Sequence, residues 1–228
     1  MFAERYKNRL TVQKTSGLYR DPPEVATKDG KFLLIGGRKI LNFASNDYLG
    51  LGVSEELRQK ASQNFLKYGT SSSSSRLVSG NYSVINDAEN SYASYFGYDD
   101  ALFFPSGYQA NMGVLATFLE KGDTVIFDKH IHASSVKGMT MSGADFYGYN
   151  HNSMSHLEKR LTAHRNGQVA VVTESLFSMD GDMLDAPGIK TLKDRYGFLA
   201  IVDEAHAFGA AGMGGRGIAC AVADIARS

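Results

Sequence analysis

The segment with the clearest chemical potential is Asp203-Glu204-Ala205-His206, which directly follows the apolar run 199–202. A carboxylate at the last position of a buried strand is costly unless it has a partner. A basic ring nitrogen would satisfy Asp203, and the carboxylate would in turn keep that nitrogen protonated. His206 can hydrogen-bond the same ligand. The segment therefore predicts a site for a nitrogen heterocycle.

A second candidate site lies where Ser106, Gly107 and Tyr108 follow the apolar run 101–104 and open a predicted helix. The first N–H groups of a helix have no partner within the helix, and its dipole gives that end a partial positive charge. Gly107 lets a ligand approach the backbone. Many strand-to-helix turns carry Ser-Gly, so this turn alone is only a candidate phosphate site.

Two more polar side chains follow apolar runs. His132 comes after the run 124–127, and Glu174 ends the run 169–173. The His132 ring could stack on a flat ligand or carry a proton, or it could be structural; Glu174 could simply cap nearby backbone. A phosphate site, a flat stacking group and a buried aspartate for a pyridine-like nitrogen are together what pyridoxal phosphate requires.

Composition and motifs exclude several other classes. The 24 Lys and Arg residues balance 24 Asp and Glu residues, which disfavours a nucleic-acid protein. No Gly-x-x-x-x-Gly-Lys-[Ser/Thr] loop is present, so a P-loop NTPase is disfavoured, and no His and carboxylate cluster has metal-ligand spacing. Cys220 is the single cysteine, which excludes an internal disulfide. No segment approaches the roughly 18–20 apolar residues of a membrane span. The N-terminus has no apolar secretory core, so we expect a cytoplasmic protein.

The elements that must position these side chains alternate along the chain. Four apolar runs predict buried strands at 101–104, 124–127, 169–173 and 199–202. The stretches between and before them predict helices at 54–66, 83–96, 107–120, 134–142, 153–163 and 187–196. Such alternation is typical of an α/β fold with a mostly parallel sheet covered by helices on both faces. Ligands of these sheets bind beyond the carboxyl ends of the strands.

The first fifty residues have a different pattern. Residues 31–35 and 38–42 flank Gly36-Gly37, which predicts a β-hairpin. Residues 12–23 look irregular, and Pro22-Pro23 would end a helix there. We therefore expect an N-terminal arm at 1–50 and a cofactor-binding domain at 51–228.

Seven segments together resemble the α-oxoamine synthase family of fold-type-I pyridoxal-phosphate enzymes. They occur in the family's order and span nearly the whole chain. The segments are 42–51 (Asn-Phe-Ala-Ser-Asn-Asp-Tyr-Leu-Gly-Leu), 75–81, 104–111, 132–134, 173–182, 203–206 and 215–217. The resemblance implies the large domain of a fold-type-I transferase with pyridoxal 5'-phosphate as its cofactor.

The resemblance also implies roles for particular residues. Ser106, Gly107 and Tyr108 would bind the phosphate, His132 would stack on the pyridine ring, and Asp203 would pair with the ring nitrogen. His206 would hydrogen-bond the phenolic oxygen, and Glu174 and Ser178 would line the cofactor pocket. Arg20 and Asn46 would contact the substrate.

The reaction implied by the resemblance is the decarboxylative condensation of an amino acid with an acyl-CoA or acyl-carrier-protein thioester, in a homodimer. L-Alanine and a pimeloyl thioester, as in biotin synthesis, are favoured. Glycine C-acetyltransferase, 5-aminolevulinate synthase and serine palmitoyltransferase activities remain alternatives. So do a fold-type-I aminotransferase or lyase and a non-catalytic partner subunit.

Two departures from the family pattern bear on function. The loop before Arg76 is usually glycine-rich, but here it contains five serines, Ser71 to Ser75. The family's Schiff-base lysine lies roughly thirty residues past the aspartate that matches Asp203. The sequence ends at Ser228. We therefore expect the given chain to lack that lysine and the small C-terminal domain, and to be inactive by itself.

Overall fold

The computed structural model describes residues 2–164 and 167–220 of the chain. The chain divides into two compact units, residues 1–62 and residues 63–228. The predicted domain boundary, between residues 50 and 51, lies earlier than this division. The two units are described separately.

The first unit contains a helix and a small antiparallel sheet. Helix α1 spans Phe2–Thr15, and the sheet has the order β1 (Val25–Asp29), β2 (Phe32–Ile35) and β3 (Arg38–Leu41). Gly36 and Gly37 join β2 to β3 with φ angles of 55° and 75°, which suit a two-residue hairpin turn. The predicted hairpin is present. The prediction that residues 12–23 are irregular is wrong for the end of α1, whose side chains are all exposed and give little amphipathic signal.

The rest of the first unit leads into a helix that crosses the division. A short 3₁₀ helix covers Leu51–Val53, and α2 spans Glu55–Tyr68. Asp47 joins Lys28 in an ion pair at 2.7 Å and accepts a hydrogen bond from the Gly52 N–H at 3.2 Å. These contacts lower the pKa of Asp47, chiefly through Lys28. The ion pair connects β1 to the segment that precedes α2.

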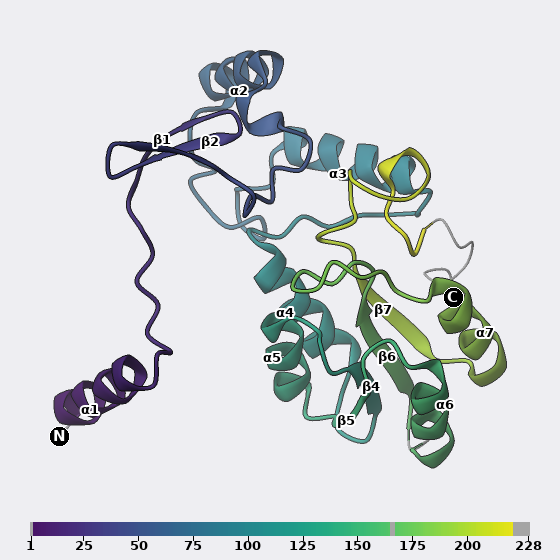
Figure 1. Ribbon diagram of the computed structural model, residues 1–228. Helices are drawn as coiled ribbons and strands as arrows, with labels where there is room; N and C mark the ends of the chain where they lie inside the picture. Colours follow the sequence, from purple (N-terminus) through teal and green to yellow (C-terminus); the bar gives the residue numbers. More distant parts are fainter. Residues whose placement is uncertain (1, 165–166, 221–228) are drawn as a thin grey trace. The chain divides into compact units, whose positions relative to one another are not determined.

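The second unit is built on a four-stranded parallel sheet (Figure 1). Its strands are β4 (Thr124–Asp128), β5 (Asp145–Tyr149), β6 (Val169–Glu174) and β7 (Leu199–Asp203), in the order β5-β4-β6-β7. All three neighbouring pairs are parallel. The predicted α/β class with a parallel sheet is confirmed, and β5 is a strand that the sequence patterns did not indicate.

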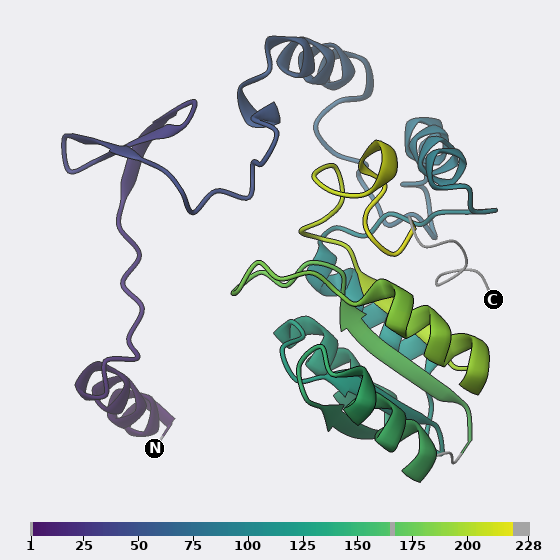
Figure 2. The ribbon, with the colours of Figure 1, turned by 45° about the vertical axis from the view of Figure 1, so that its right-hand side comes forward.

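Helices cover both faces of this sheet, as Figures 1 and 2 show. The α-helices that lie wholly within the described part of this unit are α3 (Ser83–Phe96), α4 (Gly107–Phe118), α5 (Ala133–Ser142), α6 (Met154–Ala163) and α7 (Ala186–Tyr196). Leu115 of α4 and Met139 of α5 share a core with Val125 and Val172. On the other face, α6 and α7 share a second core with the alternate strand residues, among them Ile126 and Val171. This alternation follows from the period of two in a β-strand.

The chain changes direction across the sheet after β5. From β4 it crosses to β5 on one side and then to β6 on the other side of β4. Ligands of open α/β sheets bind at such a switch point, beyond the carboxyl ends of the strands. The two strands that flank this point are β4 and β6. His132 follows β4, and Glu174 is the last residue of β6.

The predicted strand at Ala101–Phe104 is wrong. The structure assigns no strand there, and most of this run is exposed. The Phe103 N–H donates a hydrogen bond to Oε1 of Glu89 at 2.7 Å, where a strand would pair with a neighbouring strand. Glu89 is itself held by Arg76. A short apolar run alone does not define a strand.

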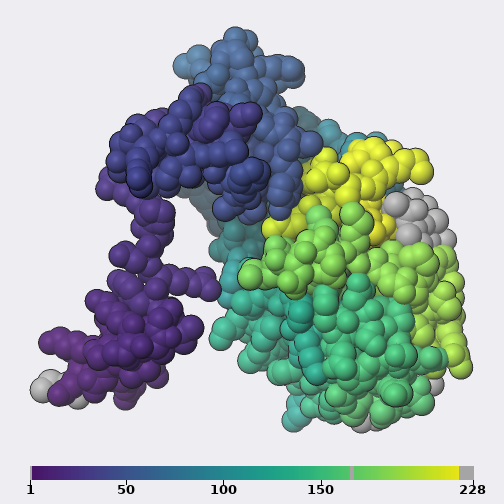
Figure 3. Space-filling view, in the orientation of Figure 1, coloured from purple at the N-terminus to yellow at the C-terminus, as the bar shows by residue number. Residues whose placement is uncertain are grey.

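The segment after β7 folds back on the second unit. Glu204 accepts hydrogen bonds from the N–H groups of Ile218, at 3.1 Å, and Ala219, at 2.6 Å. The Tyr95 hydroxyl of α3 donates to the carbonyl of Gly214. Figure 3 shows the yellow residues of this segment on the surface beside the green residues. Among the residues that the structure describes, no helix is long and apolar enough to cross a membrane.

Candidate active site

A cavity of about 430 Å³ lies at the carboxyl ends of the strands of the second unit. This volume falls within the roughly 300–1,000 Å³ typical of small-molecule sites. Its lining comes from the start of α4, the segment after β4, and the ends of β6 and β7. The lining residues are Gly107, Tyr108, Ala110, Asn111, His132, Ser134, Glu174, Ser178, Val202, Asp203, Glu204, Ala205 and His206.

The start of α4 forms one wall of the cavity. Ser106 caps this helix, because its Oγ accepts a hydrogen bond from the Gln109 N–H at 3.2 Å. Gly107 and Tyr108 follow in the first turn and line the cavity. A Cβ placed on Gly107 would meet no atom within 4 Å, so the backbone faces open space. Ser106 is thus placed as a helix cap, and the N-terminal N–H groups of α4 are available to an anion.

Asp203 is held at the end of β7 by two donors. Asn111 Nδ2 donates to Asp203 Oδ2 at 2.7 Å, and the Ala205 N–H donates to Oδ1 at 2.9 Å. The two donors, one to each oxygen, fix the orientation of the carboxylate. Asn111 belongs to α4, so the helix that presents Gly107 also orients Asp203.

A chain of hydrogen bonds connects Asp203 to His132. Asn111 Nδ2 also donates to Ser134 Oγ at 2.9 Å, and Ser134 Oγ lies 2.7 Å from His132 Nδ1. The Ser134 N–H points at the same nitrogen at 3.3 Å. Because Ser134 Oγ accepts from Asn111, its own hydrogen is available to Nδ1. His132 Nδ1 is therefore an acceptor, which assigns the ring hydrogen to Nε2.

Glu174 is buried beside this network. Its Oε1 accepts a hydrogen bond from the His132 N–H at 2.5 Å, and Glu174 is paired in register with Asp203 across β6 and β7. Burial raises the pKa of Glu174 to about 7; the His132 N–H opposes this rise and the Asp203 charge adds to it. Glu174 therefore titrates near neutrality and can carry a proton in the cavity.

Glu174→Gln is expected to remove a pH dependence of stability. The pKa of Glu174 rises from 4.5 to about 7 on folding, so the folded state holds this proton more tightly. In the wild type, the contribution of this group to the free energy of unfolding therefore falls as the pH rises from 4.5 to 7. The Gln variant lacks this fall and is the more stable protein at pH 8. Urea unfolding at pH 5, 6, 7 and 8 measures the difference, with the exposed Glu120→Gln as control. Equal slopes for Glu174→Gln and the wild type would contradict the assignment.

The structure brings most of the predicted site residues together. Seven of them line the one cavity: Gly107, Tyr108, His132, Glu174, Ser178, Asp203 and His206. Their individual roles remain predictions. Arg20 and Asn46 belong to the first unit, and their contacts with a substrate also remain predictions.

Sequence reasoning assigned no role to Asn111 or Ser134. Both lie within segments that carried the family resemblance, at 104–111 and 132–134. Asn111 lies four residues after Gly107 on α4, a spacing that places both on one helix face. That spacing was the signal available in the sequence. Within the described residues, no group of three His, Cys, Asp or Glu side chains is arranged to hold a metal ion.

The fold and the cavity together define the large domain of a fold-type-I transferase. The family model for aminotransferase class I and II matches residues 38–225. The chain therefore belongs to the aminotransferase class I and II family, and the predicted fold-type-I pyridoxal-phosphate family is confirmed.

Two curated relatives are similar in sequence to this chain over most of its length. An 8-amino-7-oxononanoate synthase of Haemophilus ducreyi is 42% identical over 96% of this chain, which spans 58% of that protein. One of Geobacter sulfurreducens is 41% identical over 92% of this chain and 54% of that protein. The chain thus spans less than two thirds of the length of these curated relatives.

Solved structures are similar as well. Sphingomonas wittichii serine palmitoyltransferase has a TM-score of 0.88 and 28% identity, with 98% of this chain and 57% of that chain covered. The 8-amino-7-oxononanoate synthase of Francisella tularensis has a TM-score of 0.66 and 30% identity, covering 79% of this chain and 49% of that one. Another matched serine palmitoyltransferase structure contains PLP.

Proposed function

We propose that this chain is the cofactor-binding part of a pyridoxal-phosphate-dependent acyltransferase that condenses L-alanine with a pimeloyl thioester. This is the 8-amino-7-oxononanoate synthase activity of biotin synthesis. The observation that carries the proposal is the single cavity that gathers the α4 N-terminus, His132 and Asp203. The names of the relatives that are about 40% identical support the same activity.

The residues of the cavity fit the proposed cofactor. The phosphate needs an anion site, which the first turn of α4 supplies beside the open space at Gly107. The pyridine nitrogen needs a fixed carboxylate, which Asp203 supplies with Asn111 and Ala205 holding its two oxygens. The ring needs a flat neighbour, and His132 lines the same cavity.

Each residue of the cavity would then have a defined task. The N–H groups of Gly107 and Tyr108 would bind phosphate oxygens, with Ser106 fixing the start of the helix. Asp203 would hold a proton on the ring nitrogen. His132 would stack on the ring, with Ser134 fixing its orientation. His206 would hydrogen-bond the phenolic oxygen, and Glu174 and Ser178 would line the pocket.

When bound, pyridoxal phosphate acts as an electron sink for the carbanion at the substrate's α-carbon. In the overall reaction, the α-carbon forms a bond to the thioester carbonyl carbon, the thiol of CoA or of the carrier protein leaves, and carbon dioxide is lost. Arg20 would bind a substrate carboxylate or the acyl end, and Asn46 would approach the substrate. The protein's contribution is to hold these groups in fixed positions around the cofactor.

The alternatives within the family use other substrates. Serine palmitoyltransferase is favoured by one observation, since its solved structures match this chain at higher TM-scores than the Francisella tularensis structure. Glycine C-acetyltransferase and 5-aminolevulinate synthase activities differ from the proposed one in the amino acid and thioester alone. The amino acid and thioester therefore define the test.

The test measures CoA release by the full-length protein, which is expected to be as long as the curated relatives. L-Alanine with pimeloyl-CoA is expected to give a kcat/KM at least about tenfold above glycine with acetyl-CoA, glycine with succinyl-CoA or L-serine with palmitoyl-CoA, the kind of discrimination that a pocket contact supplies. The 228-residue chain is expected to give no product. Preference for serine and palmitoyl-CoA would replace the proposed function with the alternative, and product from the short chain would refute its expected inactivity.

The proposal extends to assembly and location. We propose a homodimer of the full-length protein in the cytoplasm, as the family resemblance implies. Light scattering of the purified full-length protein measures the oligomeric state.

A further inference from the structure

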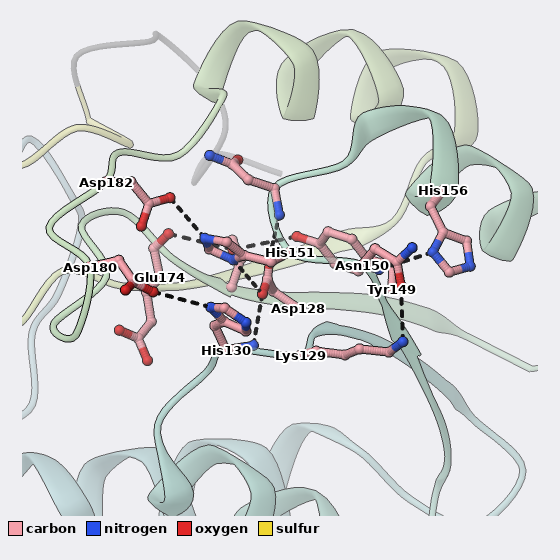
Figure 4. Close-up of polar contacts among 12 residues, drawn as sticks. Asp128, Lys129, His130, Tyr149, Asn150, His151, His156, Glu174, Asp180 and Asp182 are labelled. Atoms are coloured by element: carbon pink, nitrogen blue, oxygen red, sulfur yellow. Dashed lines mark hydrogen bonds and ion pairs between the residues drawn. The ribbon is translucent and has the colours of Figure 1, made fainter.

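A cluster of charged side chains lies outside the cavity, behind the segment that carries Ser178. Figure 4 shows its centre, His151, between Asp128 and Asp182. His151 Nδ1 lies 2.9 Å from Asp128 Oδ1, and its Nε2 lies 2.8 Å from Asp182 Oδ2. Asp128 ends β4, His151 follows β5, and Asp182 lies after β6. The imidazole thus connects two strand ends to a loop.

Both ring nitrogens of His151 face a carboxylate, which determines its protonation. A neutral imidazole has one N–H and could donate to one carboxylate only, whereas the imidazolium donates to both. Asp128 is fully buried and also accepts from the N–H groups of His130 and Asn152, each at 2.8 Å. Donors thus reach both oxygens of Asp128, from His130 to Oδ1 and from Asn152 to Oδ2. The imidazolium is the form of His151 that can donate to both carboxylates at once.

Asp182 depends on this cation. Within the described residues, Asp182 Oδ1 is buried and has no hydrogen-bond partner. The hydrogen bond between His151 Nε2 and Asp182 Oδ2 therefore holds this carboxylate in place. The Phe177 ring, 2% exposed, packs edge-on against the His151 ring at 4.4 Å. The Phe177 N–H donates to the Asp182 carbonyl at 3.0 Å. His151 consequently contacts both sides of the loop that runs through Ser178.

We propose that His151 is a positioning residue: its imidazolium bridges Asp128 and Asp182 and thereby holds residues 175–183, with Ser178, against the cavity. The neighbouring Asn152 ties the far end of this loop, since its Nδ2 donates to the Met183 carbonyl at 2.7 Å. Loss of His151 therefore loosens the loop without detaching it. The link to the cofactor rests on the proposed function, but the position of the loop does not.

The charges around His151 determine the pH range of this effect. Burial lowers the pKa of His151, but the hydrogen bonds to Asp128 and Asp182 outweigh it and hold the pKa above its usual 6.5. The other groups that face the ring are His130, stacked on it at 4.0 Å, with Asp180 beyond, and Glu174 and Tyr149 from the strand ends. Because the folded state raises this pKa, the bridge is complete below pH 6.5 and is lost as the pH rises through the raised value.

The test compares the wild-type chain with His151→Gln, Asp182→Asn and a control, His156→Gln, at a histidine nearby in the sequence. Amide hydrogen exchange of residues 175–183 is expected to be about tenfold faster in the first two variants at pH 6.5, the size of a lost charge-assisted hydrogen bond. After correction for intrinsic exchange, the wild type reaches the variants' rates at high pH, and His151→Gln shows no such pH dependence. Nitrogen-15 NMR is expected to show both His151 nitrogens protonated at pH 6.5.

Two results would overturn the proposal: a singly protonated His151 at pH 6.5, or unchanged exchange at 175–183 in both variants. Fluorescence titration of the full-length protein with pyridoxal phosphate is a separate measurement, in which His151→Gln is expected to bind about tenfold more weakly. If the full-length protein does not bind this cofactor while the NMR and exchange results hold, the proposed function fails and the role of His151 stands.

Discussion

Asp203→Asn is expected to lower kcat of the full-length protein about 10²–10³-fold, the cost of removing one preorganised electrostatic group. The substitution keeps the shape of the side chain and removes its charge. A neutral amide cannot hold a proton on the cofactor's ring nitrogen, and removal of the α-proton then slows. The fold is expected to remain intact, because the Ala205 N–H can still donate to the amide oxygen at position 203.

The contacts of Asp203 make a graded test possible. Asn111 donates to Asp203 and to Ser134, so Asn111→Ala removes the orientation of the carboxylate but not its charge. We expect a smaller loss than for Asp203→Asn. Asp194→Asn is a matched control, since Asp194 lies on α7 in an exposed ion pair with Lys190. A kcat within twofold of wild type for Asp203→Asn would remove Asp203 from its assigned role.

Cofactor binding by the full-length protein gives a measurement that does not depend on turnover. Asp203→Asn is expected to weaken the binding of pyridoxal phosphate about tenfold or more, as for other charge-assisted hydrogen bonds. Fluorescence titration measures this change, and circular dichroism checks that the variant is folded. Weaker binding with an unchanged spectrum would assign the loss to the site.

The parallel sheet was predictable where strands are apolar and bounded by helices. The runs at 124–127, 169–173 and 199–202 are β4, β6 and β7, because buried parallel strands are continuous apolar runs. β5 has the sequence Asp-Phe-Tyr-Gly-Tyr, in which a glycine at the fourth position and a partly exposed face weaken the pattern. Ala101–Phe104 has the apolar pattern but no neighbouring strand in the described part of the chain. Whether a run pairs depends on tertiary neighbours, which the local sequence does not contain.

The site was predictable to the extent that the sheet rule applies. His132 follows β4 and Asp203 ends β7, so a parallel sheet places both at one edge. Gly107 begins α4 without a preceding strand of this sheet among the described residues, so the rule does not account for its place. The partners of these residues come from distant parts of the chain: Asn111 and Asp203 are 92 residues apart. His151 was not indicated either, because its bridge depends on three separate chain segments meeting. Local patterns thus identify the groups that face a ligand better than the groups that orient them.

Gly138→Ala is expected to destabilise the chain, which is the reverse of the usual effect. Alanine in place of glycine within a helix ordinarily stabilises by about 0.5–1 kcal/mol. Gly138 is buried in α5, where a Cβ would lie 2.8 Å from the Asn111 carbonyl oxygen and 2.8 Å from Leu115 Cβ. The carbonyl belongs to the backbone of α4 and cannot rotate away. Overpacking of this kind costs about 1–3 kcal/mol, so the net sign is destabilising.

Urea unfolding measures the stability change, and Gly113→Ala on α4 is the matched control. The nearest atom to a Cβ at Gly113 is Phe104 Cε1 at 3.0 Å, the end of a partly exposed side chain that can move. We expect Gly113→Ala to be neutral or stabilising. Equal or greater stability of Gly138→Ala relative to wild type would show that α4 and α5 can separate without cost.

The same substitution connects the packing of α4 to the chemistry of the site. The Asn111 carbonyl that Gly138 accommodates belongs to the residue whose side chain orients Asp203 and Ser134. A shift of α4 of a few tenths of an ångström therefore lengthens hydrogen bonds that end on the cofactor-facing groups. Pyridoxal phosphate binding by Gly138→Ala is expected to weaken together with its stability, whereas a side chain that merely filled space would change stability alone. Retained affinity in a destabilised Gly138→Ala chain would separate the helix contact from the site.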